Sequence, residues 1–185
     1  MVEQNPLYPE SKNIIKEIVT VPVHYIDREG NEHEGVIEMH KSVAQDVQIF
    51  FQAAYHLHFP IQEIAASSAY GWVDQKLTSA NTTSGFNYRT IAGSTKLSLH
   101  SQGLAFDVNP RLNPYIRFDK DTAFIDPPGA TYDPSLPGTL TPNHALVDLM
   151  KSMGWEWGGD WTPDTGRTDY QHFQKPPTSP SDALQ

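Results

Sequence analysis

The sequence predicts one α+β domain in which a small antiparallel sheet is flanked by helices. Residues 19–25 alternate apolar and polar side chains, residues 27–31 have turn chemistry, and residues 35–40 resume an extended run, which together indicate a β-hairpin. Apolar residues then recur at helical spacing over residues 43–56 and again over residues 142–153, which predicts two amphipathic helices. A chain of 185 residues is long enough to bury a sizeable core within one domain.

Start signals support both helices. Ser42 is followed three residues later by Gln45, the pattern of a capping box, so we expect the first helix to begin near residue 43. In the second, Thr141 is placed as the N-cap and Pro142 as the first helical residue, and the apolar stripe ends at Gly154. The second helix is therefore expected to begin at about residue 142.

The rest of the chain has weaker patterns. Residues 65–94 are rich in Ser, Thr, Asn and Gly, and we expect loop around one short strand at residues 86–89. Residues 103–109 alternate as a strand does, with Asp107 directed away from the bulky apolar face. Prolines recur from residue 109 to 142, which predicts a long irregular and functional excursion, and residues 169–173 are expected to form a last extended segment.

These patterns suggest three parts: an N-terminal arm over residues 1–16, the domain over residues 17–175 and a flexible tail over residues 176–185. No stretch approaches the roughly 20 apolar residues that a membrane span needs, and the start of the sequence has no signal-peptide pattern. We expect no membrane span and a monomer, and the sequence leaves the compartment open.

Composition excludes several classes of function. With 13 Lys and Arg against 22 Asp and Glu, the net charge is −9, which disfavours a nucleic-acid partner. The absence of cysteine excludes disulfides, thiolate nucleophiles and cysteine-based zinc sites. Any metal must therefore be held by histidines and carboxylates.

A metal site of that kind is predicted around His100 and Asp107. These residues are seven apart, which would place them on opposite faces of one continuous strand. Gly103 lies between them and tolerates positive φ, so a break there can bring both side chains to one side. His172, which shares one face of the last extended segment with Tyr170 and Gln174, would complete a ligand set of two imidazoles and one carboxylate. Such a set suits Zn²⁺ with an open position for water, as in catalytic sites.

Two further residues are candidates for catalysis. Asp169 lies three residues before His172, where a carboxylate that is not a ligand can accept a proton from an activated water. Arg89 is the nearest preceding cation, and it would either stabilise a tetrahedral intermediate or clamp a substrate carboxylate. His56 and His58 are close in sequence, but nothing near them supplies a third ligand, so we expect a surface role for them.

The segment Ser98-Leu99-His100-Ser101-Gln102-Gly103-Leu104-Ala105-Phe106-Asp107 matches the S-x-H-x-x-G-x-A-x-D signature of the M15 zinc peptidases. Residues 81–89, 154–161 and 169–173 also resemble segments of that family. The resemblance implies a fold like that of the D-Ala-D-Ala peptidases and Hedgehog domains. It also implies that the zinc ligands are His100, Asp107 and His172, that the general base is Asp169, and that Arg89 faces the scissile carbonyl or a substrate carboxylate. Many relatives have Glu where this chain has Asp169, which is shorter by one methylene.

The resemblance implies a zinc-dependent peptidase that cleaves an amide bond in a peptidoglycan stem peptide. Two activities remain open, that of a D,D-carboxypeptidase and that of an L-Ala-D-Glu endopeptidase. The expected place of action is the bacterial cell wall, for a secreted, periplasmic or phage-encoded protein. The alternative is a catalytically inactive, zinc-stabilised module that binds the cell wall or a protein, because Hedgehog-type signalling domains resemble these enzymes in structure.

Overall fold

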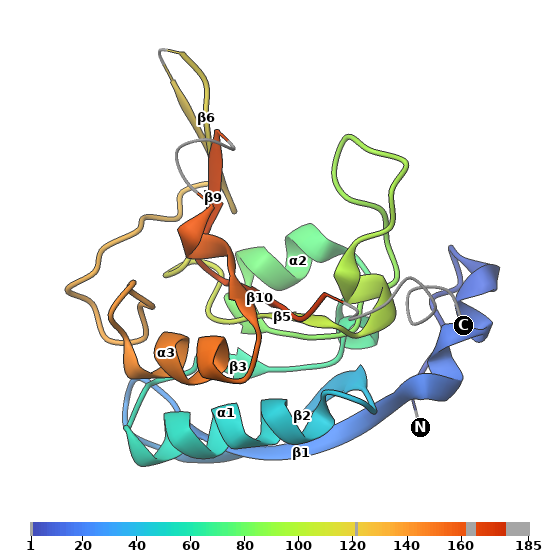
Figure 1. The fold of residues 1–185 in the computed structure, drawn as a ribbon, viewed down its shortest axis with the longest axis horizontal. Helices are drawn as coiled ribbons and strands as arrows, with labels where there is room; N and C mark the ends of the chain where they lie inside the picture. Colours follow the sequence, from blue (N-terminus) through green and yellow to red (C-terminus); the bar gives the residue numbers. More distant parts are fainter. Residues whose placement is uncertain (1, 121, 162–165, 177–185) are drawn as a thin grey trace.

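The computed structural model describes residues 2–120, 122–161 and 166–176, and its arrangement of short helices and small sheets is α+β, as predicted (Figure 1). The strands are β1 Ile18–Ile26, β2 Glu32–His40, β3 Glu63–Ile64, β4 Thr82–Thr83, β5 Ala105–Asp107, β6 Tyr115–Phe118, β7 Ala123–Asp126, β8 Glu156–Trp157, β9 Arg167–Asp169 and β10 His172–Gln174. The helices are α1 Ala44–His56, α2 Asp74–Ser79 and α3 Ala145–Ser152, with 3-10 helices at Pro9–Lys12, Ile14–Glu17, Ser67–Tyr70, Leu99–Gln102 and Gly158–Asp160.

The predicted hairpin is confirmed as β1 and β2, which pair antiparallel along their whole length. Alternation buries Val21 and Val23 of β1 together with Ile37 and Met39 of β2. Helix α1 packs along this hairpin, and its buried residues join the same core cluster (Figure 1). The hairpin and α1 thus form a base on which the rest of the molecule is built.

A second layer lies on the other side of α1. Strands β5, β10 and β8 form an antiparallel sheet in that order, and α3 packs beside α1. Phe106 of β5 and Phe173 of β10 are cross-strand partners, and each has its ring within 5.5 Å, centroid to centroid, of the ring of Phe50 in α1. Since successive side chains point to opposite faces of a strand, the neighbours of these phenylalanines face away from the core.

The N-terminal segment packs against the body of the protein. Val2, Tyr8 and Ile14 contact a small apolar cluster that contains Trp72, Phe86 and Tyr88. Asn5 is buried, and its side-chain amide donates a hydrogen bond to the carbonyl oxygen of Tyr88 at 3.0 Å. The predicted arm therefore supports the segment that leads to Arg89.

The prediction for residues 65–94 was wrong in detail. The structure has a 3-10 helix at Ser67–Tyr70 and the helix α2 there, and the short strand is β4 rather than residues 86–89. Strand β4 pairs parallel with β3, while residues 86–89 bond to other parts of the chain: the Phe86 amide donates to the Glu38 carbonyl and the Asn87 amide to the His100 carbonyl. These are long-range contacts, and a helix of six residues such as α2 is too short to show a clear hydrophobic period.

The excursion at residues 109–142 is irregular only in part, because it contains the hairpin of β6 and β7. These strands are partly exposed on both faces, so they lack the alternation that identifies a half-buried strand. The last extended segment is also divided, since β9 ends at Asp169 and β10 begins at His172. Strand β9 pairs with β6 in a sheet that projects from the rest of the molecule (Figure 1).

The first helix begins within one residue of its predicted start, but its predicted capping box and the predicted start of the second helix were wrong. Helix α1 begins at Ala44, and Ser42 bonds through its hydroxyl to His40 Nδ1 at 2.7 Å instead of capping the helix. Helix α3 begins at Ala145, three residues later than expected, because His144 is the N-cap and its Nδ1 accepts from the Leu146 amide at 3.2 Å. No helix within the described ranges is long and apolar enough to cross a membrane. Of the predicted tail, residues 177–185 lie outside the described residues.

Candidate metal centre

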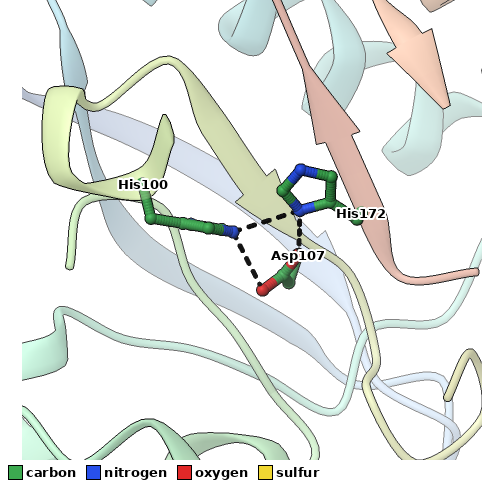
Figure 2. Close-up of side chains that lie close together, drawn as sticks. All are labelled: His100, Asp107 and His172. Carbon is green, nitrogen blue, oxygen red and sulfur yellow. Dashed lines mark hydrogen bonds and ion pairs between the residues drawn. The ribbon is translucent and has the colours of Figure 1, made fainter. Parts of the chain in front are cut away.

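His100, Asp107 and His172 converge on one point, although 65 and 72 residues separate His172 from the other two (Figure 2). His100 Nε2 lies 3.2 Å from His172 Nδ1 and 3.2 Å from Asp107 Oδ2, and His172 Nδ1 lies 3.0 Å from Asp107 Oδ1. All three residues are buried. Elsewhere in the part of the chain that the structure describes, no three His, Cys, Asp or Glu residues form such a group.

A tight turn between the 3-10 helix and β5 places His100. Ser98 is the N-cap of Leu99–Gln102 and accepts a hydrogen bond from the His100 amide, and Gly103 ends the helix with φ 65°. A Cβ atom on Gly103 would lie 2.6 Å from the backbone nitrogen of His40, which no side chain can tolerate without movement. The predicted break at Gly103 is thus confirmed, and it turns His100 toward the face on which Asp107 lies.

Strand register places Asp107 beside His172. They are direct cross-strand partners in the β5–β10 pair, one position along from the partners Phe106 and Phe173. Because the phenylalanines face the core, Asp107 and His172 share the opposite face of the sheet. The apolar packing that fixes the register therefore also fixes the distance between the two polar side chains.

The outer hydrogen bonds of the two imidazoles decide which ring nitrogens carry hydrogen. His100 Nδ1 lies 2.8 Å from the carbonyl oxygen of Gly85, which can only accept, so Nδ1 carries the hydrogen and Nε2 presents a lone pair. His172 Nε2 lies 3.1 Å from Gln174 Oε1, another acceptor, so His172 Nδ1 presents a lone pair. Two lone pairs and a carboxylate thus face one another, an arrangement that a cation stabilises.

The spacing of these atoms fits a small divalent cation. Ligand atoms bound to zinc at about 2.0–2.1 Å in a tetrahedron are roughly 3.4 Å apart, and the three separations here are 3.2, 3.2 and 3.0 Å. The donor set of two nitrogens and one oxygen suits zinc, and each imidazole has the outer hydrogen-bond partner that metal-binding histidines usually have. The residues present therefore fit a metal ion of this kind.

The surroundings of Asp107 favour the ionised form of its carboxyl group. Burial alone would raise the pKa of Asp107. The positive charges and hydrogen bonds that His100 and His172 supply in the metal-free protein, when both ring nitrogens carry hydrogen, outweigh burial and hold the pKa of Asp107 well below its ordinary value. An ionised carboxylate is the form that binds a metal ion.

The surroundings of Asp169 instead favour the protonated form of its carboxyl group. Its Oδ1 is shielded from solvent and has no hydrogen-bond partner among the described residues. The net pKa of Asp169 is about 7, above its ordinary value of 3.8. Burial is the largest cause and the charge of Asp107 adds to it, while His172, Gln171 and Arg89 act in the opposite direction. Asp169 is not one of the three clustered residues, but the charges of His172 and Asp107 act on its carboxyl group. A carboxyl group with this pKa can hold or release a proton near neutral pH.

Arg89 is held through both its side chain and its backbone. Its Nε donates to Asp74 Oδ1 at 2.8 Å, and its backbone exchanges hydrogen bonds with the Ser101 hydroxyl, next to His100. The Arg89 side chain remains 23% exposed, so the protein does not enclose it fully. Sequence analysis gave Asp74 no role, because nothing in the sequence pairs it with a residue 15 positions away.

The long segment after β7 also contacts the site. Tyr132 stacks on Tyr170 with ring centroids 3.6 Å apart and planes 5° from parallel, and the Tyr132 hydroxyl donates to the Leu140 carbonyl. Tyr170 lies in the turn between Asp169 and His172. The excursion thus buttresses that turn. His56 and His58 are exposed and outside the cluster.

Comparison with known families gives one match. A family described as D-alanyl-D-alanine carboxypeptidase matches residues 92–175, a little under half of the chain. This match supports the resemblance to the M15 peptidases, and it contains His100, Asp107, Asp169 and His172 but not Arg89. No curated protein and no solved structure matches the chain. Over residues 92–175, then, the chain is similar to a family of peptidases, and the buried group in the same residues can bind a metal.

Proposed function

We propose that this protein is a zinc-dependent peptidase that hydrolyses an amide bond in a peptidoglycan stem peptide. The observation that carries the proposal is the convergence of two imidazole lone pairs and an ionised carboxylate at the spacing of zinc ligands. The match to a D-alanyl-D-alanine carboxypeptidase family over the same residues favours a peptide of the cell wall as substrate, and action outside the cytoplasm.

In the proposed site the metal would be held by His100 Nε2, Asp107 and His172 Nδ1. Zinc bound by these three residues would supply Lewis-acid polarisation of the substrate carbonyl and would acidify water in the open position. Asp169 Oδ1 accepts the proton of the attacking water and later delivers it to the leaving amine. Its pKa of about 7 in the metal-free protein suits both transfers near neutral pH.

Arg89 is proposed to bind an oxygen of the substrate. Asp74 occupies Nε, and the outer edge of the guanidinium can donate to a single carbonyl oxygen or to both oxygens of a carboxylate. A free terminal carboxylate would favour the D,D-carboxypeptidase reaction, and an internal carbonyl would favour the L-Ala-D-Glu endopeptidase reaction.

Cleavage of purified muropeptides tests the proposal. The zinc-loaded protein is expected to release either D-alanine or a peptide cut after L-alanine, while the Asp169→Ala variant binds zinc equally and cleaves neither bond. Release of D-alanine would favour a terminal carboxylate as the substrate group that Arg89 binds. Zinc uptake by the wild-type protein without cleavage of any stem peptide would contradict the proposal and favour an inactive binding module.

A further inference from the structure

Beyond the residues that would touch the metal, the polar face of the β5–β10–β8 sheet carries two more side chains in line with His172. Gln174 lies two residues further along β10, on the same face as His172. Glu156 of β8 is the direct cross-strand partner of Gln174. The register that pairs His172 with Asp107 on one side therefore pairs Gln174 with Glu156 on the other.

These side chains form a chain of hydrogen bonds with one possible direction. Glu156 Oε2 lies 2.6 Å from Gln174 Nε2, and a carboxylate only accepts, so the amide must present its NH₂ group to Glu156. The amide oxygen of Gln174 then faces His172 Nε2 at 3.1 Å and can only accept from it. The hydrogen of His172 is thereby kept on Nε2, and Nδ1 is left with its lone pair toward Asp107 and His100.

We propose that Gln174, oriented by Glu156, is a positioning residue that selects the His172 tautomer needed for metal binding. Without it, the hydrogen of a neutral His172 is free to occupy Nδ1, where it would form a hydrogen bond to Asp107 Oδ1 at 3.0 Å and block the lone pair. His100 has a backbone acceptor for the same purpose, the Gly85 carbonyl. His172 depends on side chains, so its tautomer is open to mutation.

The proposal rests on the proposed zinc site, and it is tested by zinc affinity, measured by competition with a chelator, rather than by activity. Gln174→Met keeps the length of the side chain but removes the acceptor, and loss of such an outer partner typically weakens metal binding roughly 10–100-fold. The double exchange Gln174→Glu with Glu156→Gln keeps the net charge and rebuilds the chain, because the introduced carboxylate accepts from both neighbours. It is expected to restore affinity. Gln45→Met, at an exposed position of α1, is the matched control and should bind zinc as the wild type does.

The nitrogen-15 spectrum of the His172 ring gives a second readout that a general loss of stability would not mimic. The wild type and the double exchange should show a protected Nε2–H signal, and Gln174→Met should lose it. Wild-type affinity and a protected Nε2–H in Gln174→Met would overturn the proposal. If the wild type bound no zinc, the proposed function would fail, while the Nε2–H signal of the metal-free protein would still test the role of Gln174.

Discussion

Replacement of Asp169 by Asn should remove activity and, in the metal-free protein, increase stability at neutral and alkaline pH. The Asp169 carboxyl has a pKa of about 7, above its ordinary value of 3.8, chiefly because it is buried. When folding raises the pKa of an acid, ionisation of that acid favours the unfolded state. The free energy of unfolding therefore falls as the pH rises from the pKa in the unfolded state to the pKa in the folded state. Asn cannot ionise, so the variant should not show this loss.

The size of the effect follows from the two pKa values. At about 1.4 kcal/mol per pKa unit, a difference of about three units corresponds to at most about 4 kcal/mol, of which up to about 3 kcal/mol develops between pH 5 and pH 8. Urea unfolding of the wild type and of Asp169→Asn in the presence of a chelator, at these two pH values, measures the difference directly. The reasoning would be refuted if the two proteins lost the same stability between pH 5 and pH 8.

Three further predictions test separate parts of the account. His100→Ala should lower zinc affinity and abolish cleavage, whereas His56→Ala at an exposed position should change neither, as measured by metal content and muropeptide cleavage; equal zinc content in both variants would contradict the ligand assignment. Asp74→Ala should leave zinc content unchanged but lower kcat/KM roughly 10–100-fold, because Arg89 loses the partner that orients it; an unchanged kcat/KM would show that this ion pair does not orient the guanidinium. Glu38→Gln should stabilise the protein at pH 8 by up to about 3 kcal/mol and much less at pH 5, because burial and then the charge of a nearby acid raise the pKa of Glu38 to about 7, and thermal unfolding at both pH values checks this; an equal effect at both would argue against a raised pKa.

The sequence was most informative where the site depends on local geometry. The spacing of His100 and Asp107 around Gly103 required a break, and the structure has a positive φ at Gly103. The alternation of side chains in β5 and β10 also predicted that Phe106 and Phe173 lie on one face of the sheet and the polar residues on the other, as the structure shows. Short-range rules govern these features, so they can be predicted from a few adjacent residues.

The parts that sequence analysis missed depend on contacts between distant segments. Asp74 acquires its role from Arg89, and Glu156 acquires its role from Gln174, which lies 18 residues away and opposite it in a sheet. The Gly85 carbonyl oxygen lies 2.8 Å from His100 Nδ1, and Gly85 packs so closely against β2 that a Cβ atom on it would clash with the Glu38 carbonyl oxygen. Strand register and close backbone approach decide such pairs, and neither has a local pattern.

A crystal structure of the protein grown with zinc, analysed by anomalous diffraction at the zinc edge, tests the central claim most directly. The account predicts one strong peak bound by His100 Nε2, His172 Nδ1 and an Asp107 oxygen, at bond lengths of about 2.0–2.2 Å. A peak at the exposed pair His56 and His58, or no peak among the three buried side chains, would contradict it.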